Sequence, residues 1–253
     1  MLWEEKERNL IEDFKLLATN NIVLLSEWDL LEDFLNIILD EEEWKKWKDS
    51  SAKSDLPPDF YNDNKKIMME VMRVDDHGYR KYGKTRNPLR EKEHKIEREL
   101  KELGLFENFP NAQLIINAPT NLPTEEDHNY NRYYKEFQRT VQQHIDNIEN
   151  YRKNHKGYKL VLFIYDESTG YIEKDSESEN SINGGLHEYF IDKKFVECFI
   201  NADVDYVIWM APYKVFFTSE GIIELPKAAI YAKGNLIKEL VQYQSDRMVS
   251  AEK

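Results

Sequence analysis

Two runs of apolar residues constrain the fold of this chain more than any other feature. Residues 159–165, KLVLFIY, and residues 204–210, VDYVIWM, each have the length of one β-strand. Strands with continuous apolar runs are typical of a sheet that is covered by helices on both faces. We therefore expect an α/β protein whose central sheet contains both segments.

Helical patterns and shorter strand patterns surround these two runs. Ser26 and Asp29 form a capping-box-like pair at the start of one helix, and Gly104 ends another. Apolar residues recur every three or four positions in the helical segments. We predict helices over 2–18, 26–47, 89–103, 129–154, 190–201 and 235–248, a strand at 111–118, and edge strands at 214–217 and 228–232.

The order of these segments bears on the domain organisation. Helices and strands alternate without a clean break, which favours a single α/β domain. We expect a mixed central β-sheet flanked by helices, with an N-terminal helical extension. The helical part covers residues 1–50 and the sheet domain residues 51–253, and together they form one continuous structural unit.

Composition excludes several classes of protein. The net charge of −13 does not steer the whole molecule to nucleic acid, so nucleic-acid binding would need a local basic patch. A single cysteine, Cys198, excludes an intramolecular disulfide and fits a reducing cytoplasm. The acidic N-terminal stretch is unlike a secretory signal, and the apolar runs are far shorter than a membrane span. We expect a cytoplasmic protein without a membrane segment.

Residues 56–76, LPPDFYNDNKKIMMEVMRVDD, contain the main candidate site. They predict a turn, a short strand, a tight polar reversal and a second strand. Asp59 follows two prolines, and Glu70 interrupts an apolar run. Because side chains alternate along a strand, Met68, Glu70 and Met72 share one face. Two carboxylates on paired strands can bind one Mg²⁺ or Mn²⁺ ion.

This hairpin resembles the PD-(D/E)XK, or restriction-endonuclease-like, nuclease superfamily. Pro58-Asp59 corresponds to the "PD", and Glu70-Val71-Met72 corresponds to the "(D/E)XK". The resemblance extends in element order over residues 27–210. It implies a hydrolase that cleaves phosphodiester bonds with Mg²⁺ or Mn²⁺, in which Asp59 and Glu70 bind the metal. It also implies a carboxylate from a preceding helix, Glu32 or else Glu27.

The sequence departs from the family pattern at the lysine. That position holds Met72, and Arg73 points to the opposite face of the strand. Lys66 shares the face of Glu70, and Arg90 or Lys92 from the next segment is a further substitute. Without such a replacement the catalytic site is incomplete.

A basic segment follows the hairpin. Residues 78–90 contain no acidic residue, and Tyr79 and Tyr82 interleave with the cations, an arrangement suited to phosphate and base contacts. The alternative is a surface loop that pairs with the acidic N-terminal helices. The candidate nucleic-acid contacts are Arg80, Lys81, Lys84, Arg86 and Arg90.

Other interpretations stay open. The protein is alternatively a non-catalytic module on a nuclease-like fold that binds a protein partner, with Glu70 in an ordinary buried ion pair with Arg or Lys. A third interpretation is a small-molecule enzyme that uses the strand ends at Asp166 and Met210. His77, beside Asp75 and Asp76, is a candidate metal ligand or general base, and the alternative is an ordinary loop residue at the end of the strand. Cys198, between Phe195 and Phe199, is expected to be a buried, inert thiol.

Overall fold

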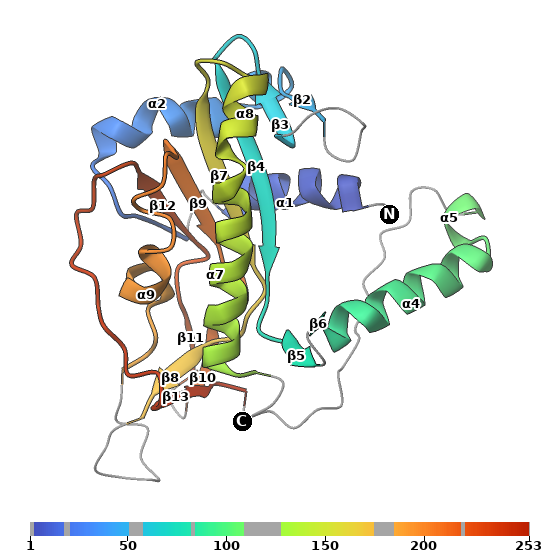
Figure 1. The fold of residues 1–253 in the computed structure, drawn as a ribbon, viewed down its shortest axis with the longest axis vertical. Helices are drawn as coiled ribbons and strands as arrows, with labels where there is room; N and C mark the ends of the chain where they lie inside the picture. The colour runs from blue at the N-terminus through green and yellow to red at the C-terminus, as the bar shows by residue number, and fades with distance from the viewer. Residues whose placement is uncertain are drawn as a thin grey trace.

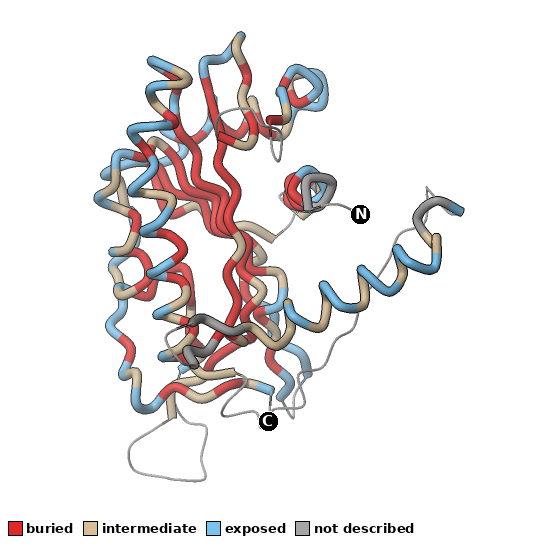
Figure 2. Tube along the Cα trace, turned by 45° about the vertical axis from the view of Figure 1, so that its right-hand side comes forward, coloured by how far each residue is buried: buried red, intermediate tan, exposed pale blue. Residues whose placement is uncertain are grey.

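A computed structural model describes residues 3–17, 21–50, 58–81, 84–108, 128–174, 185–218 and 221–252. It shows the predicted α/β architecture, in which a mixed central sheet has helices on both faces (Figure 1). Strand β7 (Lys159–Asp166) pairs in parallel with β4 (Ile67–Val74) on one side and with β9 (Tyr206–Met210) on the other. Every residue of β7 after Lys159 is buried, as its apolar run predicted (Figure 2).

Among the described residues the central sheet has seven strands, and both of its edges come from the N-terminal part of the chain. Residues 1–50 therefore share one sheet with the rest of the protein rather than preceding it. The strand order is β1 (Ile22–Leu24), β12 (Ala228–Ala232), β9, β7, β4, β3 (Phe60–Asn62) and β2 (Lys48–Asp49).

Helices α1 (Trp3–Leu17), α2 (Trp28–Leu39) and α3 (Glu41–Trp44) cover one face of the sheet. Their apolar stripes meet the strands directly, with Phe14 edge-on to Phe163 at 5.8 Å between ring centroids. Phe34 stacks on Tyr206 at 4.2 Å. Aromatic pairs of this kind add stabilisation beyond the area that they bury.

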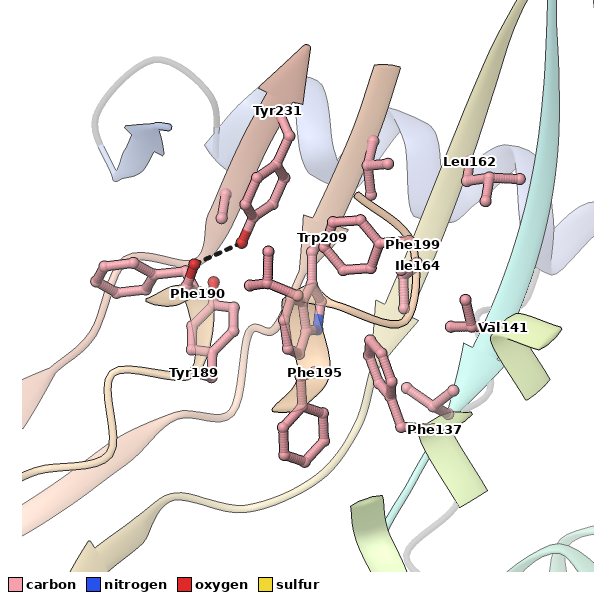
Figure 3. Close-up of a cluster of buried hydrophobic side chains, with 14 of the residues drawn as sticks. Phe137, Val141, Leu162, Ile164, Tyr189, Phe190, Phe195, Phe199, Trp209 and Tyr231 are labelled. Carbon is pink, nitrogen blue, oxygen red and sulfur yellow. Dashed lines mark hydrogen bonds between the residues drawn. The ribbon is translucent and has the colours of Figure 1, made fainter. Parts of the chain in front are cut away.

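The opposite face carries α7 (Tyr130–Asp146), α8 (Ile148–Asn154), the 3₁₀ turn η1 (Tyr189–Ile191) and α9 (Lys193–Val196). Figure 3 shows how side chains from α7, β7, β9 and β12 meet here around Trp209 and Phe195. The Tyr231 hydroxyl donates to the carbonyl of Phe190 at 2.7 Å, so the one polar atom of that ring is satisfied within the core.

The helix predicted over 26–47 begins two residues late and divides into α2 and α3. Glu27, not Ser26, precedes its first turn, and the Glu27 side chain makes no cap hydrogen bond. The Ser26 hydroxyl instead accepts a hydrogen bond from the Ala232 amide at 2.8 Å and donates to the carbonyl of Asn235. The Ser26 hydroxyl, which the sequence pattern assigned to the helix cap, therefore bonds to the end of β12 instead.

The prediction of a helix over 235–248 is wrong. This segment crosses the protein in an extended form, and its amides bond to other segments: Ile237 N–H to Leu25 and Val241 N–H to Ile191. Because those carbonyls already satisfy the backbone, no local helix is needed. The segment ends in β13 (Met248–Ser250), which pairs with β8 (Tyr171–Glu173). The helix predicted over 190–201 is reduced to η1 and α9.

The predicted edge strands also differ from the structure. Strand β12 is internal, paired with β9 on one side and with β1 on the other. Strand β10 (Val215–Thr218) pairs with β11 (Gly221–Glu224) in a separate hairpin. The strand predicted at 111–118 lies outside the described residues.

Helix α4 (Pro88–Glu102) matches its prediction and has both expected caps. The Asn87 side chain accepts a hydrogen bond from the Arg90 amide at 3.1 Å, and Gly104 has φ of 68° after the last turn. The helix reaches away from the sheet and none of its residues is buried (Figures 1 and 2). It is followed by α5 (Leu105–Asn108). The segment before it is a hairpin of β5 (Tyr79–Lys81) and β6 (Lys84–Arg86), where a loop was predicted.

Within the described parts of the chain, no helix has the length and apolarity needed to span a membrane.

Candidate functional site

The predicted hairpin forms and brings Asp59 beside β4. Strand β3 pairs with only the first three residues of β4, in the register Phe60 opposite Met69. Beyond that point the edge of β4 is open to Asp59, whose Oδ2 accepts a hydrogen bond from the Val71 amide at 2.8 Å. The Ser50 amide donates to the Asp59 carbonyl at 2.8 Å. Both bonds fix this carboxylate against the strand that carries Glu70.

Glu70 points to the α7 side of the sheet, the face predicted for it, and is 7% exposed. Its Oε1 accepts a hydrogen bond from the Tyr151 hydroxyl at 2.9 Å and lies 3.0 Å from His144 Nδ1. The described contacts of Glu70 are thus with a tyrosine and a histidine rather than with the Arg or Lys of an ordinary buried ion pair. The Oε2 atom is buried and has no hydrogen-bond partner among the described residues. A buried carboxylate oxygen of this kind is a suitable ligand for a cation.

Asp59 lies in an unusually negative environment. Burial raises the pKa of this carboxyl to about 8, and the nearby charges of Glu70, Glu7 and Asp49 raise it as well, against the lowering effect of the Val71 amide. These four carboxylates come from α1, β2, β4 and the residue before β3. We call them the carboxylate site.

Glu7 is the member of this site that the sequence patterns did not predict. It is 5% exposed on α1, one turn before Leu10 and Ile11, so it occupies the buried stripe of that helix. A charge within an apolar stripe is the signal that could have identified it. The predicted helix carboxylates, Glu32 and Glu27, are both exposed at or on α2.

Lys66, the predicted substitute on the face of Glu70, does not lie at the carboxylate site. Met72, at the lysine position, is 2% exposed within the core. Lys66 is exposed at the hairpin turn with φ of 51°, and its Nζ donates to the Tyr158 hydroxyl at 3.3 Å. Four residues separate it from Glu70, roughly 13 Å along an extended strand.

The predicted basic contacts divide into two groups. Arg90 lies in the first turn of α4, where its guanidinium pairs with Asp75 at 3.1 Å. That ion pair, and not one with the acidic N-terminal helices, occupies this side chain. The other four stand on the β5–β6 hairpin, and their side chains lie outside the described parts of the structure: Arg80, Lys81, Lys84 and Arg86.

The strand end at Asp166 is closed to ligands. Asp166 has no exposed surface and accepts hydrogen bonds from Tyr133, from the Trp209 indole at 3.0 Å and from the Ser168 hydroxyl at 2.7 Å. The buried ammonium of Lys214 lies 3.6 Å away. This network satisfies a buried charge, and we assign it a structural role.

Cys198 is half-buried rather than buried. Its thiol donates to the carbonyl of Lys194 at 3.3 Å, and burial raises the pKa of the thiol to about 11. The group therefore stays protonated at neutral pH, which makes it a poor nucleophile.

The acids around His77 have different partners. Asp75 accepts hydrogen bonds from Asn87 and Arg90. Asp76 and His77 instead meet His128, which comes two residues before α7, and the ligand atoms of the three lie within 4.8 Å of one another. Among the described residues this is the only group of three or more such side chains with that spacing. Sequence patterns singled out His77 and Asp76 but gave no reason to add His128.

The chain matches no protein-family model, and comparisons with curated proteins and with solved structures also gave no match.

Proposed function

We propose that this protein is a divalent-cation-dependent hydrolase of phosphodiester bonds, with the carboxylate site as its cation site. The observation that carries the proposal is the half-buried Asp59 carboxyl, which bonds to the Val71 amide of the strand that holds Glu70 and whose pKa is raised to about 8. Gathering these acids in a half-buried place costs free energy in the absence of a cation, and a bound cation offsets that cost.

The ligand set fits Mg²⁺ or Mn²⁺. Both ions prefer oxygen ligands, and Mg²⁺ usually binds one or two carboxylates together with water and a substrate phosphate. Asp59 and Glu70 supply these ligands, and Glu7 adds negative charge from α1. When bound, the ion would lower the pKa of a water molecule and neutralise charge on the phosphate.

The order of elements supports the same proposal. A helix carboxylate precedes a hairpin that carries Asp59 and Glu70, and a helical crossover then leads to the parallel strand β7. This is the arrangement that the resemblance to PD-(D/E)XK nucleases implies.

His144 is the candidate for the function of the missing lysine. Its Nδ1 lies 3.0 Å from Glu70 Oε1, and its side chain is 25% exposed. A histidine that is oriented by a carboxylate can accept a proton from an attacking water. We assign His144 this role because it contacts Glu70 directly, whereas Met72 is buried and Lys66 is at the hairpin turn.

Calorimetric titration of the chelator-treated protein with Mn²⁺ and Mg²⁺, followed by cleavage of labelled DNA and RNA, tests this proposal. We expect Asp59→Asn and Glu70→Gln each to weaken cation binding at least about tenfold, roughly 1.4 kcal/mol, and to abolish cleavage. Asp146→Asn, an exposed carboxylate on α7, serves as the matched control and should change neither. Cation binding that is equally tight in all four proteins would overturn the proposal.

One observation favours the alternative, a non-catalytic module that binds a protein partner. Phe217 and Ile222 on the β10–β11 hairpin are 79% and 63% exposed, and exposed apolar patches mark interaction surfaces. This alternative predicts that the wild-type protein cleaves no nucleic acid with either ion. It also predicts that Phe217→Ser disrupts a complex with the partner and leaves the fold unchanged.

A further inference from the structure

A second group of potential metal ligands lies at the other end of β4, away from the carboxylate site. Asp76 has no exposed surface, and the side chains of His77 and His128 are each 12% exposed. The two imidazole rings stand edge to face, with 4.8 Å between their centroids. Both rings face the same carboxylate oxygen, Asp76 Oδ1.

The spacing of these atoms is that of ligands around one ion. His128 Nδ1 lies 3.1 Å from Asp76 Oδ1, and His77 Nε2 lies 3.9 Å from it. With metal–ligand bonds near 2.0–2.1 Å, neighbouring ligand atoms of a tetrahedral ion are about 3.3 Å apart. The Asp76–His128 pair already has this separation, and all three ligand atoms lie within 4.8 Å of one another.

The orientation of Asp76 supports the same conclusion. Although His128 Nδ1 is within 3.1 Å, Asp76 Oδ1 is fully buried and accepts no hydrogen bond from any described residue. A fully buried carboxylate oxygen normally has a hydrogen-bond donor or a cation as its partner. Here the oxygen lies 3.1 Å from His128 Nδ1 and 3.9 Å from His77 Nε2.

The surroundings hold the ligands in place. Asp76 Oδ2 accepts hydrogen bonds from the Tyr171 hydroxyl at 2.7 Å and from the Thr169 amide at 3.2 Å. The other nitrogen of the His128 ring, Nε2, lies 3.1 Å from a carboxylate oxygen of Glu252. Histidines that bind metals usually donate their other ring nitrogen to a carboxylate or a carbonyl, which fixes the tautomer and the orientation of the ring.

The chemical types of the three ligands indicate which class of metal would bind. Two imidazoles and one carboxylate suit zinc and related divalent transition metals, whereas Mg²⁺ prefers oxygen ligands only. Because the three side chains are almost entirely buried, exchange of a substrate at this position is restricted. This burial, rather than the number of protein ligands, favours a structural role for the ion.

We propose that Asp76, His77 and His128 bind a divalent transition metal of the zinc class, with a water molecule in the fourth position. The ion fastens the end of β4 to the start of α7, and Glu252 orients His128 from the C-terminal segment. This site uses none of the residues of the carboxylate site, so it stands independently of the proposed nuclease function.

Titration of chelator-treated protein with Zn²⁺ and Co²⁺ tests the site. We expect one Co²⁺ per chain with the visible absorption of a tetrahedral ion. In Asp59→Asn, whose carboxylate site is impaired, the melting temperature should rise with Zn²⁺ but not with Mg²⁺. His77→Gln and His128→Gln should each weaken Zn²⁺ binding at least about tenfold. His94→Gln, whose side chain is 77% exposed on α4, is the matched control and should bind Zn²⁺ as the wild type does.

Two further variants keep the test decisive. If His128→Gln fails to fold, Glu252→Gln leaves all three ligands in place and should still weaken Zn²⁺ binding by about 10–100-fold. Asp59→Asn should retain full Zn²⁺ binding, which separates this site from the carboxylate site. A wild-type protein that binds neither Zn²⁺ nor Co²⁺, or His77→Gln with undiminished affinity, would overturn the proposal.

Discussion

At the scale of single residues, the proposed cation site consists of acids that lie where apolar residues would be expected. Glu7 occupies the buried stripe of α1, and Glu70 interrupts the apolar run from Ile67 to Met72 in β4. Asp59 completes the group by bonding to the open edge of β4. Burial and the neighbouring acids raise the pKa of Asp59, and the cation that we propose at this site would offset the cost of its charge.

The Asp59 carboxyl gives the metal-free protein a pH-dependent stability. Its folded-state pKa of about 8 lies above the usual value, so the folded protein binds this proton more tightly than the unfolded chain does. The free energy of unfolding therefore falls as pH rises from about 4 to about 8. Asp59→Asn removes the charge and keeps an acceptor for the Val71 amide. We expect it to raise stability by about 1–3 kcal/mol at pH 8 and to change it little at pH 4.

Urea denaturation in the presence of EDTA at both pH values measures this effect. Asp146→Asn, which is exposed, should shift neither midpoint. If Asp59→Asn destabilised the protein at pH 8, the environment inferred for Asp59 would be wrong.

At the scale of secondary-structure elements, the two edges of β4 have different partners, and its residues contribute to both candidate sites. One edge pairs along its full length with β7, and the other pairs with β3 for three residues and then receives Asp59. One face carries Glu70 between Met68 and Met72, and the carboxyl end carries Asp76 and His77. A single strand thus supplies residues to both candidate metal sites.

A lysine at position 72, where PD-(D/E)XK nucleases have one, should not create a catalytic site on β4. Met72 is 2% exposed beneath α7, so the ammonium of Met72→Lys would be buried in the apolar core. We expect this variant to lose about 3–5 kcal/mol of stability, measured by urea denaturation, and to gain no cleavage activity. Met72→Leu, which nearly conserves volume, should lose less than about 1.5 kcal/mol. A stable Met72→Lys protein with increased nuclease activity would show that position 72 does reach the carboxylate site.

At the scale of the whole molecule, the fold combines a rigid three-layer core with one projecting element. The sheet is buried between α1, α2 and α3 on one face and α7, α8 and α9 on the other. Helix α4 reaches away from this core. Its described contacts with the core include the ion pairs Arg90–Asp75 and Glu93–Arg73.

Hydrogen exchange should separate these two parts. Amides of β7, flanked by strands on both sides and buried after Lys159, should exchange only on global unfolding. Amides in the second half of α4 should exchange faster by several orders of magnitude, because no buried side chain anchors that helix. Exchange followed by mass spectrometry measures both. Protection of α4 equal to that of β7 would show that another surface covers this helix.

Much of the fold could be predicted from local patterns. The runs 159–165 and 204–210 are central strands, the stripe in 129–154 forms α7 and α8, and Gly104 follows the last turn of α4. The hairpin that carries Asp59 and Glu70 also formed as predicted, with Met68 and Met72 on one face of β4. Such features depend on which side of a helix or strand is buried, and this information is present in the spacing of apolar residues.

Tertiary structure alone decided which distant segments meet. The position of β12 inside the sheet, the extended course of 235–248 and the use of Ser26 at the end of β12 all depend on backbone partners far away in the chain. The same holds for both candidate sites, since Glu7 joins Asp59 and His128 joins Asp76 across more than 50 residues. The sequence by itself determined the elements and the chemical groups they carry, because burial patterns are local. The structure determined which groups share a site, because that depends on the packing of the whole chain.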